Sequence, residues 1–221
     1  MATINVNRQG LGTGIANGNF NTARTNAASA VTDGITGGGS VQYFATGRTK
    51  RFKRAFLHFD TSGITGTLSE AHIDINGSSV LHSDPNDTIM VKSTAFGDDG
   101  GTALSTADHF GSVIYSTAYS KELTTWSTGN NEYILTAAAL ADIKNNDHFT
   151  LAVIDHDNDY ANSDATATSD IGIDFNTTIT LDFTFAAASG YTHDVNGVAA
   201  ASIGKVSSVA TASIGKINSV D

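Results

Sequence analysis

The stretch Ile179-Thr-Leu-Asp-Phe-Thr-Phe185 alternates apolar and polar side chains without a break. Successive side chains of a β-strand point to opposite faces, so this run predicts a strand with one buried and one wet face. The run Ala71-His-Ile-Asp-Ile-Asn76 alternates in the same way, with Ala71, Ile73 and Ile75 on one side. Half-buried strands of this kind are typical of antiparallel sheets.

Further strands are expected in short runs of Val, Ile, Phe and Thr that Gly, Asn and Asp turn signals separate. The expected strands cover residues 3–6, 41–45, 54–59, 71–76, 88–93, 131–135, 149–155 and 179–185. One short helix is expected over residues 136–144, where Thr136 is a suitable N-cap and Ala and Leu follow. Many short strands with one small helix predict an all-β, antiparallel β-sandwich.

The composition favours sheet and excludes several functions. The 221 residues include 22 Gly, one Pro and no Cys, and only 15% of them are charged. The lack of Cys excludes disulfides and thiolate metal sites. The net charge of −10 argues against nucleic acid as a partner, and no apolar run approaches the roughly 18 residues of a membrane span. Residues 1–10 have neither a basic nor an apolar signal region, so we expect no export signal, as in virus structural proteins.

We expect three segments along the chain. Residues 1–40 are rich in Gly, Asn, Thr and Ala, which predicts a loop-rich segment packed on the core. Residues 41–187 are expected to form the β-sandwich. Residues 188–221 are expected to form a linker and a repeat tail for assembly.

The tail repeats every 11 residues: VNGVAAASIGK (195–205) precedes VSSVATASIGK (206–216) and INSVD (217–221). Its recurring apolar positions are Val195, Val198, Ile203, Val206, Val209, Ile214, Ile217 and Val220. An 11-residue period would bring them to one side of a helix. Weak helix formers and the Val-Asn-Gly-Val turn signal instead favour short strands and turns, and an unstructured low-complexity tail is the third interpretation.

Two and a half repeats cannot bury their own apolar side chains, so the tail is expected to dock on other chains. We therefore expect a homo-oligomer, with a trimer as the working assumption.

The densest polar run follows the strand expected at 149–155. Asp155, Asp157 and Asp159 resemble the first half of a calcium loop, in which oxygen ligands surround Ca²⁺. The EF-hand pattern fails, because Tyr160 stands where Gly is needed and Thr166 where Glu is needed. The alternative is a solvated loop whose Asp and Asn side chains cap backbone N–H groups. No other cofactor is expected.

Two further groups of residues are candidates for binding. Five of the 12 basic residues lie within seven positions: Arg48, Lys50, Arg51, Lys53 and Arg54. They form either a contact patch for an acidic neighbouring subunit or the solvated entry of a strand that avoids edge pairing. Trp126 and Tyr119 are candidates for stacking on sugar rings, with ordinary packing as the alternative.

Parts of the sequence resemble a known family. The segments RAFLHFDTSGI (54–64) and LSEAHIDI (68–75) are similar to the start of the DNRLRE-type jelly-roll domain, in which an R-x-x-L-x-F-D strand precedes an A-x-L-x-L strand. Residues 117–143 and 149–162 resemble modules of structural proteins of tailed phages, especially marine ones. The tail resembles their C-terminal IGKVNGV repeats, and the resemblance to the domain covers approximately residues 1–187.

The resemblance implies a jelly-roll β-sandwich on the virion surface, as a capsid decoration or a tail-associated protein. Its implied partners are capsid or tail proteins of the same virion, which the repeat tail would anchor. The alternative is the carbohydrate-binding module of a tail fibre or adhesin, with a host surface glycan as ligand. No HExxH, GxSxG, CxxC or phosphate-loop motif is present, so we expect no enzymatic activity, and a polysaccharide lyase or hydrolase ranks last.

Overall fold

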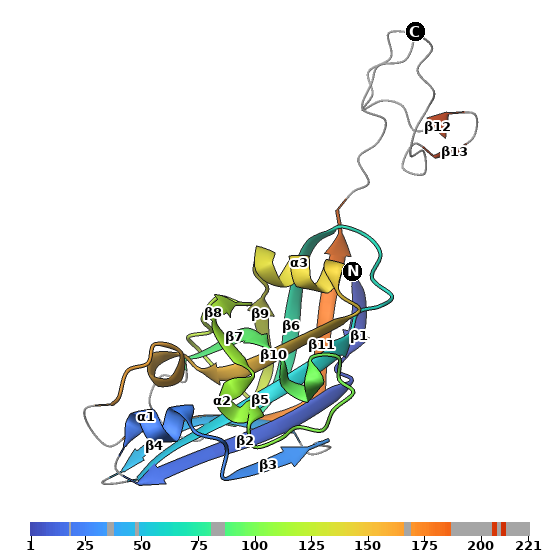
Figure 1. Cartoon of the computed structure of the whole chain (residues 1–221). Helices are drawn as coiled ribbons and strands as arrows, with labels where there is room; N and C mark the ends of the chain where they lie inside the picture. The colour runs from blue at the N-terminus through green and yellow to red at the C-terminus, as the bar shows by residue number, and fades with distance from the viewer. Residues whose placement is uncertain are drawn as a thin grey trace. The chain divides into compact units, whose positions relative to one another are not determined.

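The computed structural model describes residues 1–17, 19–34, 38–46, 49–80, 87–165, 169–186, 205–206 and 209–210. The chain divides into two compact units, Met1–Phe185 and Ala186–Asp221. The strands of the first unit are β1 (Ala2–Asn5), β2 (Arg8–Asn17), β3 (Ala30–Asp33), β4 (Gly39–Thr46), β5 (Thr49–Asp60), β6 (Leu68–Val80), β7 (Thr88–Ser93), β8 (Val113–Ala118), β9 (Gly129–Ile134), β10 (His148–Asp155) and β11 (Ser169–Phe185) (Figure 1).

The helical segments of this unit are short. They are α1 (Phe20–Thr25), the 3₁₀-helix η1 (Ala95–Gly97), α2 (Asp108–Gly111), α3 (Ala137–Asn145) and the π-helix η2 (His156–Tyr160). None of the described helices has the length and apolar character that a membrane crossing requires.

The strands form one antiparallel sheet that the central strand β4 divides into two halves. β4 pairs with β5 on one side and with β11 on the other. Beyond β5 lie β10, β7 and β8, with β2 and β3 along the other edge of β5. Beyond β11 lie β6 and β9, and β1 pairs with the end of β11. The predicted all-β, antiparallel sandwich class is therefore confirmed.

The main core lies between these two halves. Inward side chains of β5, β7 and β10 pack against those of β6, β9 and β11 in one apolar cluster. β5 is buried on both faces, because Leu57 joins this cluster while Phe56 joins a second one, with Phe96 and Leu104. The burial of β5 on both faces stabilises the unit, since each buried large apolar side chain contributes about 1.5–3 kcal/mol.

The eight expected strands are all present in the first unit, and 88–93 matches β7. Most ends are shifted by one to five residues, whereas β11 begins ten residues before the expected start at 179. The expected helix is α3, and its N-cap is Thr136, whose hydroxyl accepts a hydrogen bond from the backbone N–H of Ala139. Ala139 and Ile143 face the core from this helix. Local sequence pattern thus specifies most of the sandwich.

The expectation of a loop-rich segment over residues 1–40 is wrong, because this segment contains β1, β2, β3 and α1. The glycines of β2 look like turn signals but serve close packing. A Cβ atom at Gly14 would lie 2.5 Å from Nε2 of His109, and one at Gly12 would lie 2.8 Å from Nδ1. β2 therefore needs glycine to let the buried His109 side chain of α2 lie against its backbone.

Within the second unit, the structure describes two short strands, β12 (Lys205–Val206) and β13 (Val209–Ala210), which pair antiparallel with Val206 opposite Val209. This pairing agrees with the strand-and-turn interpretation at these four residues. The other recurring apolar positions lie outside the described residues: Val195, Val198, Ile203, Ile214, Ile217 and Val220.

Candidate functional site

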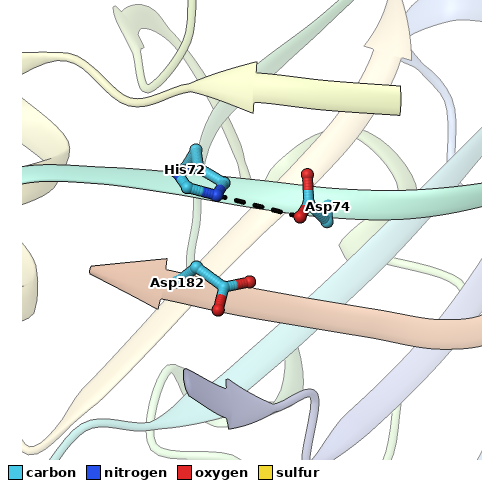
Figure 2. A group of neighbouring side chains, drawn as sticks. All are labelled: His72, Asp74 and Asp182. Atoms are coloured by element: carbon cyan, nitrogen blue, oxygen red, sulfur yellow. Dashed lines mark ion pairs between the residues drawn. The ribbon is translucent and has the colours of Figure 1, made fainter. Parts of the chain in front are cut away.

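Histidine and carboxylate side chains gather on the outer face of β6, β9 and β11, and we call His72, Asp74, Glu132 and Asp182 the His72 cluster (Figure 2). Strand register brings them together. Asp182 of β11 lies opposite His72 of β6, and Glu132 of β9 lies opposite Asp74. Nε2 of His72 lies 3.8 Å from Oδ2 of Asp74 and 3.8 Å from Oε2 of Glu132.

Two threonine hydroxyl groups support this cluster. Thr3 of β1 lies opposite Asp182 and donates a hydrogen bond to its Oδ1 atom. Thr180, which lies opposite Asp74, donates to Oδ2 of Asp182 at 2.9 Å. Both oxygens of Asp182 are therefore held by neighbours on the sheet, which fixes the orientation of the carboxylate.

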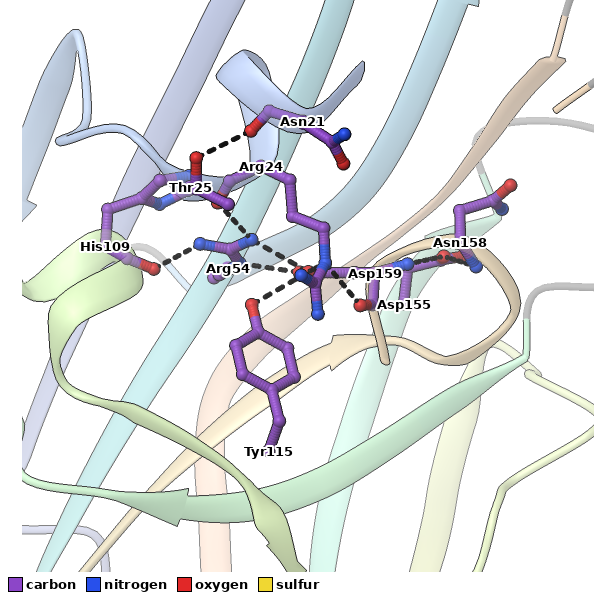
Figure 3. Close-up of polar contacts among 9 residues, drawn as sticks. All are labelled: Asn21, Arg24, Thr25, Arg54, His109, Tyr115, Asp155, Asn158 and Asp159. Atoms are coloured by element: carbon purple, nitrogen blue, oxygen red, sulfur yellow. Dashed lines mark hydrogen bonds and ion pairs between the residues drawn. The ribbon is translucent and has the colours of Figure 1, made fainter. Parts of the chain in front are cut away.

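The predicted calcium loop has a different arrangement, because it folds into the π-helix η2 after β10 (Figure 3). Oδ1 of Asp155 accepts hydrogen bonds from the backbone N–H groups of Asn158 (2.7 Å) and Asp159 (3.0 Å). Asp155 is thus the N-cap of this turn, as the solvated-loop alternative expects for the role, although its side chain is buried. Burial raises the pKa of Asp155 to about 7, against the two N–H groups that lower it.

Two arginine residues bind Asp159. Arg54, whose side chain is fully buried, binds both carboxylate oxygens of Asp159, with Nε to Oδ2 at 2.5 Å and Nη2 to Oδ1 at 2.7 Å. Arg24 Nε donates to the main-chain carbonyl of Asp159 at 2.7 Å, and the Tyr115 hydroxyl donates to Oδ1 at 2.9 Å. Figure 3 shows Arg54 also reaching the main-chain carbonyls of Arg24 and His109.

These bonds shift the titration of the buried groups. Burial acts to lower the pKa of Arg54, but the adjacent carboxylate of Asp159 outweighs it and raises that pKa. Burial and the negative charge of Asp159 raise the pKa of the Tyr115 hydroxyl. Arg54 therefore stays charged and Tyr115 stays neutral, so both remain hydrogen-bond donors to Asp159.

The metal site predicted at Asp155, Asp157 and Asp159 is therefore wrong as a ligand set, because Asp155 caps a turn and Asp159 pairs with arginine.

Asp157 lies instead beside His156, whose Nδ1 atom is 3.0 Å from Oδ1 of Asp157 and 3.1 Å from Oε1 of Glu122. Burial and the charges of Asp157 and Glu122 raise the pKa of nearby Asp87 to about 6.

The predicted basic patch does not form one free surface. Arg54 is buried in the ion pair with Asp159, so its assignment to a contact patch is wrong. Lys50 pairs with Asp164 at 2.5 Å, and the Arg51 guanidinium lies over the ring of Phe44, 4.7 Å from its centroid. Lys53 is half-buried on β5, and Arg48 lies outside the described residues.

The two aromatic candidates for glycan binding belong to the core. Trp126 is 9% exposed and lies 6.3 Å from the ring of Phe175, centroid to centroid. Tyr119 is 1% exposed, lies 4.9 Å from the ring of Phe149, and donates its hydroxyl hydrogen bond to Asp142. Neither ring offers a face to a sugar, so the glycan-stacking prediction for these residues is wrong.

The His72 cluster was not predicted from the sequence. Its members lie on the polar faces of three alternating strands, so each strand alone shows only an ordinary wet face. A signal was present in the histidine and carboxylate at i and i+2 of residues 72–74, because such residues share one face of a strand.

These described elements define an antiparallel β-sandwich that buries the ion pair of Arg54 with Asp159 and carries a histidine–carboxylate cluster on an outer sheet face. A scan against models of known protein families finds no match for the chain, and a search of curated proteins finds none either. The function is therefore inferred from the residues of this chain.

Proposed function

We propose that this chain is a non-enzymatic structural protein on the surface of a tailed-phage virion, as a capsid decoration or a tail-associated component. The observation that carries this proposal is the 11-residue repeat over residues 195–221. Its resemblance to the C-terminal IGKVNGV repeats of phage structural proteins supplies the biological context. In this proposal, the repeat anchors the protein to capsid or tail proteins of the same virion, or joins copies of this chain into an oligomer.

The division of the chain supports separate roles for the two parts. The compact unit Met1–Phe185 contains the β-sandwich, and the repeat lies entirely within the unit Ala186–Asp221. In the repeat, Val206 and Val209 lie opposite one another in two strands of two residues each. Strands of two residues are shorter than the roughly five to six residues typical of strands, so the proposal is that the repeat completes its pairing with a neighbouring chain.

The interior of the sandwich supports a scaffolding role rather than a reacting one. The residues that looked most reactive in sequence, Asp155 and Asp159, hold a turn and an arginine pair in place. A rigid module with internally paired charges suits display on a particle. The carbohydrate-binding alternative would need a surface other than Trp126 and Tyr119, because both are buried.

The proposal is tested first by composition and then by truncation. Mass spectrometry of purified particles of the source virus is expected to detect this polypeptide, and its absence would exclude a virion role. A chain that ends at Phe185 is expected to keep the circular dichroism spectrum and cooperative unfolding of the sandwich. The same truncation is expected to abolish both incorporation into particles and self-association, measured by light scattering.

A finer test uses the two described tail strands. Val206→Asp with Val209→Asp introduces charge at both apolar positions and is expected to weaken assembly strongly. Val206→Ile with Val209→Ile keeps the apolar surface and is expected to assemble normally. Equal assembly of both variants would mean that the repeat does not act through its apolar side chains.

A further inference from the structure

We propose that His72, Asp74 and Asp182 bind one divalent transition-metal ion on the outer face of the sheet (Figure 2), with Glu132 of β9 beside His72. The site lies on two neighbouring strands, β11 and β6, and its class of ligand is an ion of the Zn²⁺ or Mn²⁺ type. It would fasten these strands together across their solvent-facing side.

The spacing of the ligand atoms fits a shared ion. One nitrogen or oxygen atom from each of His72, Asp74 and Asp182 lies within 4.8 Å of the other two. The 3.8 Å separations from His72 Nε2 to Asp74 and Glu132 are too long for hydrogen bonds. Two ligands that each lie about 2.1 Å from one metal ion are separated by roughly 3–4 Å. His72, Asp74 and Asp182 therefore lie close enough for small side-chain movements to bring all three to one ion.

One buried carboxylate oxygen of the cluster lacks a hydrogen-bond partner. Oδ1 of Asp74 is buried from solvent and has no hydrogen-bond partner among the residues that the structure describes. A buried carboxylate oxygen without a donor is strongly unfavourable, so such atoms are rare in folded proteins. The Oδ2 atom of the same carboxylate faces His72, so a cation bound there would neutralise the carboxylate that carries this unpaired oxygen.

The charge balance of the face also favours a cation. Asp74 lies directly opposite Glu132, and like charges in such a cross-strand pair repel one another. In the described part of the chain, neither lysine nor arginine forms an ion pair with Asp74, Glu132 or Asp182. His72 is therefore the one side chain that pairs with these carboxylates there, and a divalent ion would compensate the excess negative charge.

The surroundings of Asp182 resemble the outer shell of a metal site. The hydroxyl groups of Thr3 and Thr180 donate to its two oxygens, and each carboxylate oxygen keeps a second lone pair for a metal. Hydrogen bonds of this kind orient ligating carboxylates in metalloproteins. The ligands are also carried by paired strands, which hold side chains more rigidly than loops do.

The donor set indicates the class of ion. Ca²⁺ and Mg²⁺ take oxygen ligands, whereas imidazole nitrogen is a common ligand of Zn²⁺ and other transition metals. One imidazole with two carboxylates therefore fits Zn²⁺ or Mn²⁺ better than Ca²⁺. His72 is the residue on which this distinction depends.

The His156 group provides an internal control because its geometry differs. There, Nδ1 already lies at hydrogen-bond distance from both Glu122 and Asp157, at 3.1 and 3.0 Å. A protonated imidazole satisfies both carboxylates without a metal ion. We therefore expect the His72 cluster, and not the His156 group, to bind the ion.

The experiment is a calorimetric titration of ZnCl₂ into the full chain, purified without a polyhistidine tag and freed of metal with a chelator. One equivalent of Zn²⁺ is expected to bind. His72→Gln is expected to lower the affinity at least about tenfold, and Thr180→Val about tenfold through the loss of the hydroxyl that orients Asp182. His156→Gln is expected to leave the affinity unchanged, and CaCl₂ is expected to bind much more weakly than ZnCl₂.

A second measurement needs no variant. Substoichiometric Mn²⁺ broadens amide signals of nearby residues, and we expect this effect at residues 71–75 and 180–183 but not at 156–157. The proposal is overturned if neither ion binds, if His156→Gln abolishes binding while His72→Gln preserves it, or if Mn²⁺ broadens residues 156–157 instead.

Discussion

Two regions of this protein contain several carboxylates, and the two regions differ in the groups that bind them. In the η2 region, Asp155 and Asp159 belong to one polar run; backbone N–H groups bind Asp155 and two arginines bind Asp159. In the His72 cluster, the acidic groups come from three neighbouring strands. The first region is buried and its Asp159 is paired with arginine, whereas the second is partly exposed and, among the described residues, has only His72 as a paired base.

The difference shows that the density of carboxylates along a chain does not decide where an ion binds. What decides it is the number of donors that the fold brings to each carboxylate. Asp159 meets the side chain of Arg54, 105 residues away in sequence, so its charge is satisfied without a metal. Asp74 meets Glu132 instead, so its charge is opposed by another negative charge.

The largest expected effect tests whether the η2 region is held by its ion pair. Arg54→Met removes the guanidinium and leaves the buried Asp159 without its bidentate partner. Breaking a buried ion pair by removing one partner costs about 3–5 kcal/mol. We expect urea denaturation to show a decrease of this size in the free energy of unfolding.

The matched control is Lys92→Met, which breaks the partly exposed ion pair between Lys92 and Asp142. Pairs near the surface contribute about 0–1 kcal/mol, so this variant is expected to remain almost as stable as the parent. The double variant Arg54→Met with Asp159→Leu is expected to regain part of the lost stability, because the buried carboxylate is gone and Arg24, which loses its ion pair, keeps its contact with the ring of Tyr115. Equal losses for Arg54→Met and Lys92→Met would contradict the distinction between the two kinds of pair.

The sequence predicted the sandwich well because alternation is a local property. The eight expected strands and the N-cap of α3 follow from residue patterns within six to nine neighbours. β2 was missed because its alternating glycines resemble those of a turn-rich loop. The reason for them is the close packing of His109, which only the structure shows. β3 and β8 were missed too, and no strong alternation marks either of them.

The sites were predicted less well because each depends on a partner that is distant in sequence. No residue near Asp159 in the sequence indicates that it pairs with Arg54, and the basic run that contains Arg54 resembles an exposed patch. Trp126 resembled a binding platform because burial cannot be determined from a single aromatic residue. The His72 cluster needs the register between β6, β9 and β11, which a sequence pattern does not specify.

The next prediction concerns the energetic cost of protonating the buried His109 side chain next to Arg54. His109 is fully buried, and neither ring nitrogen has a hydrogen-bond partner among the described residues. Burial, followed by the positive charge of Arg54, lowers the pKa of His109 to about 2. Between the unfolded pKa of about 6.5 and this value, the unfolded state binds more protons. Stability should therefore fall with decreasing pH by up to about 1.4 kcal/mol per pH unit.

His109→Leu removes this titration and two unpaired buried nitrogens. We expect the loss of stability between pH 7 and pH 5 to be smaller in the variant by about 2 kcal/mol. His58, whose pKa is lowered, acts in the same direction, and Asp87 and Asp155, whose pKa values are raised, act in the opposite one. All three remain in both proteins, so the difference isolates His109. Parallel pH profiles would mean that His109 is solvated in solution.

The smallest expected effect tests the other side of the comparison, the repulsion on the metal-free sheet face. Glu132→Gln removes the charge opposite Asp74, so in excess chelator and low salt we expect it to stabilise the protein by about 0.2–1 kcal/mol. Glu70→Gln is the control, because Glu70 lies opposite Thr184 and accepts its hydroxyl hydrogen bond. The gain should disappear in 1 M NaCl, where charges are screened within about 3 Å. With saturating Zn²⁺ its sign should reverse, since Glu132 lies beside His72 and its charge attracts the bound cation. A gain that persists with Zn²⁺ would show that no cation binds beside Glu132.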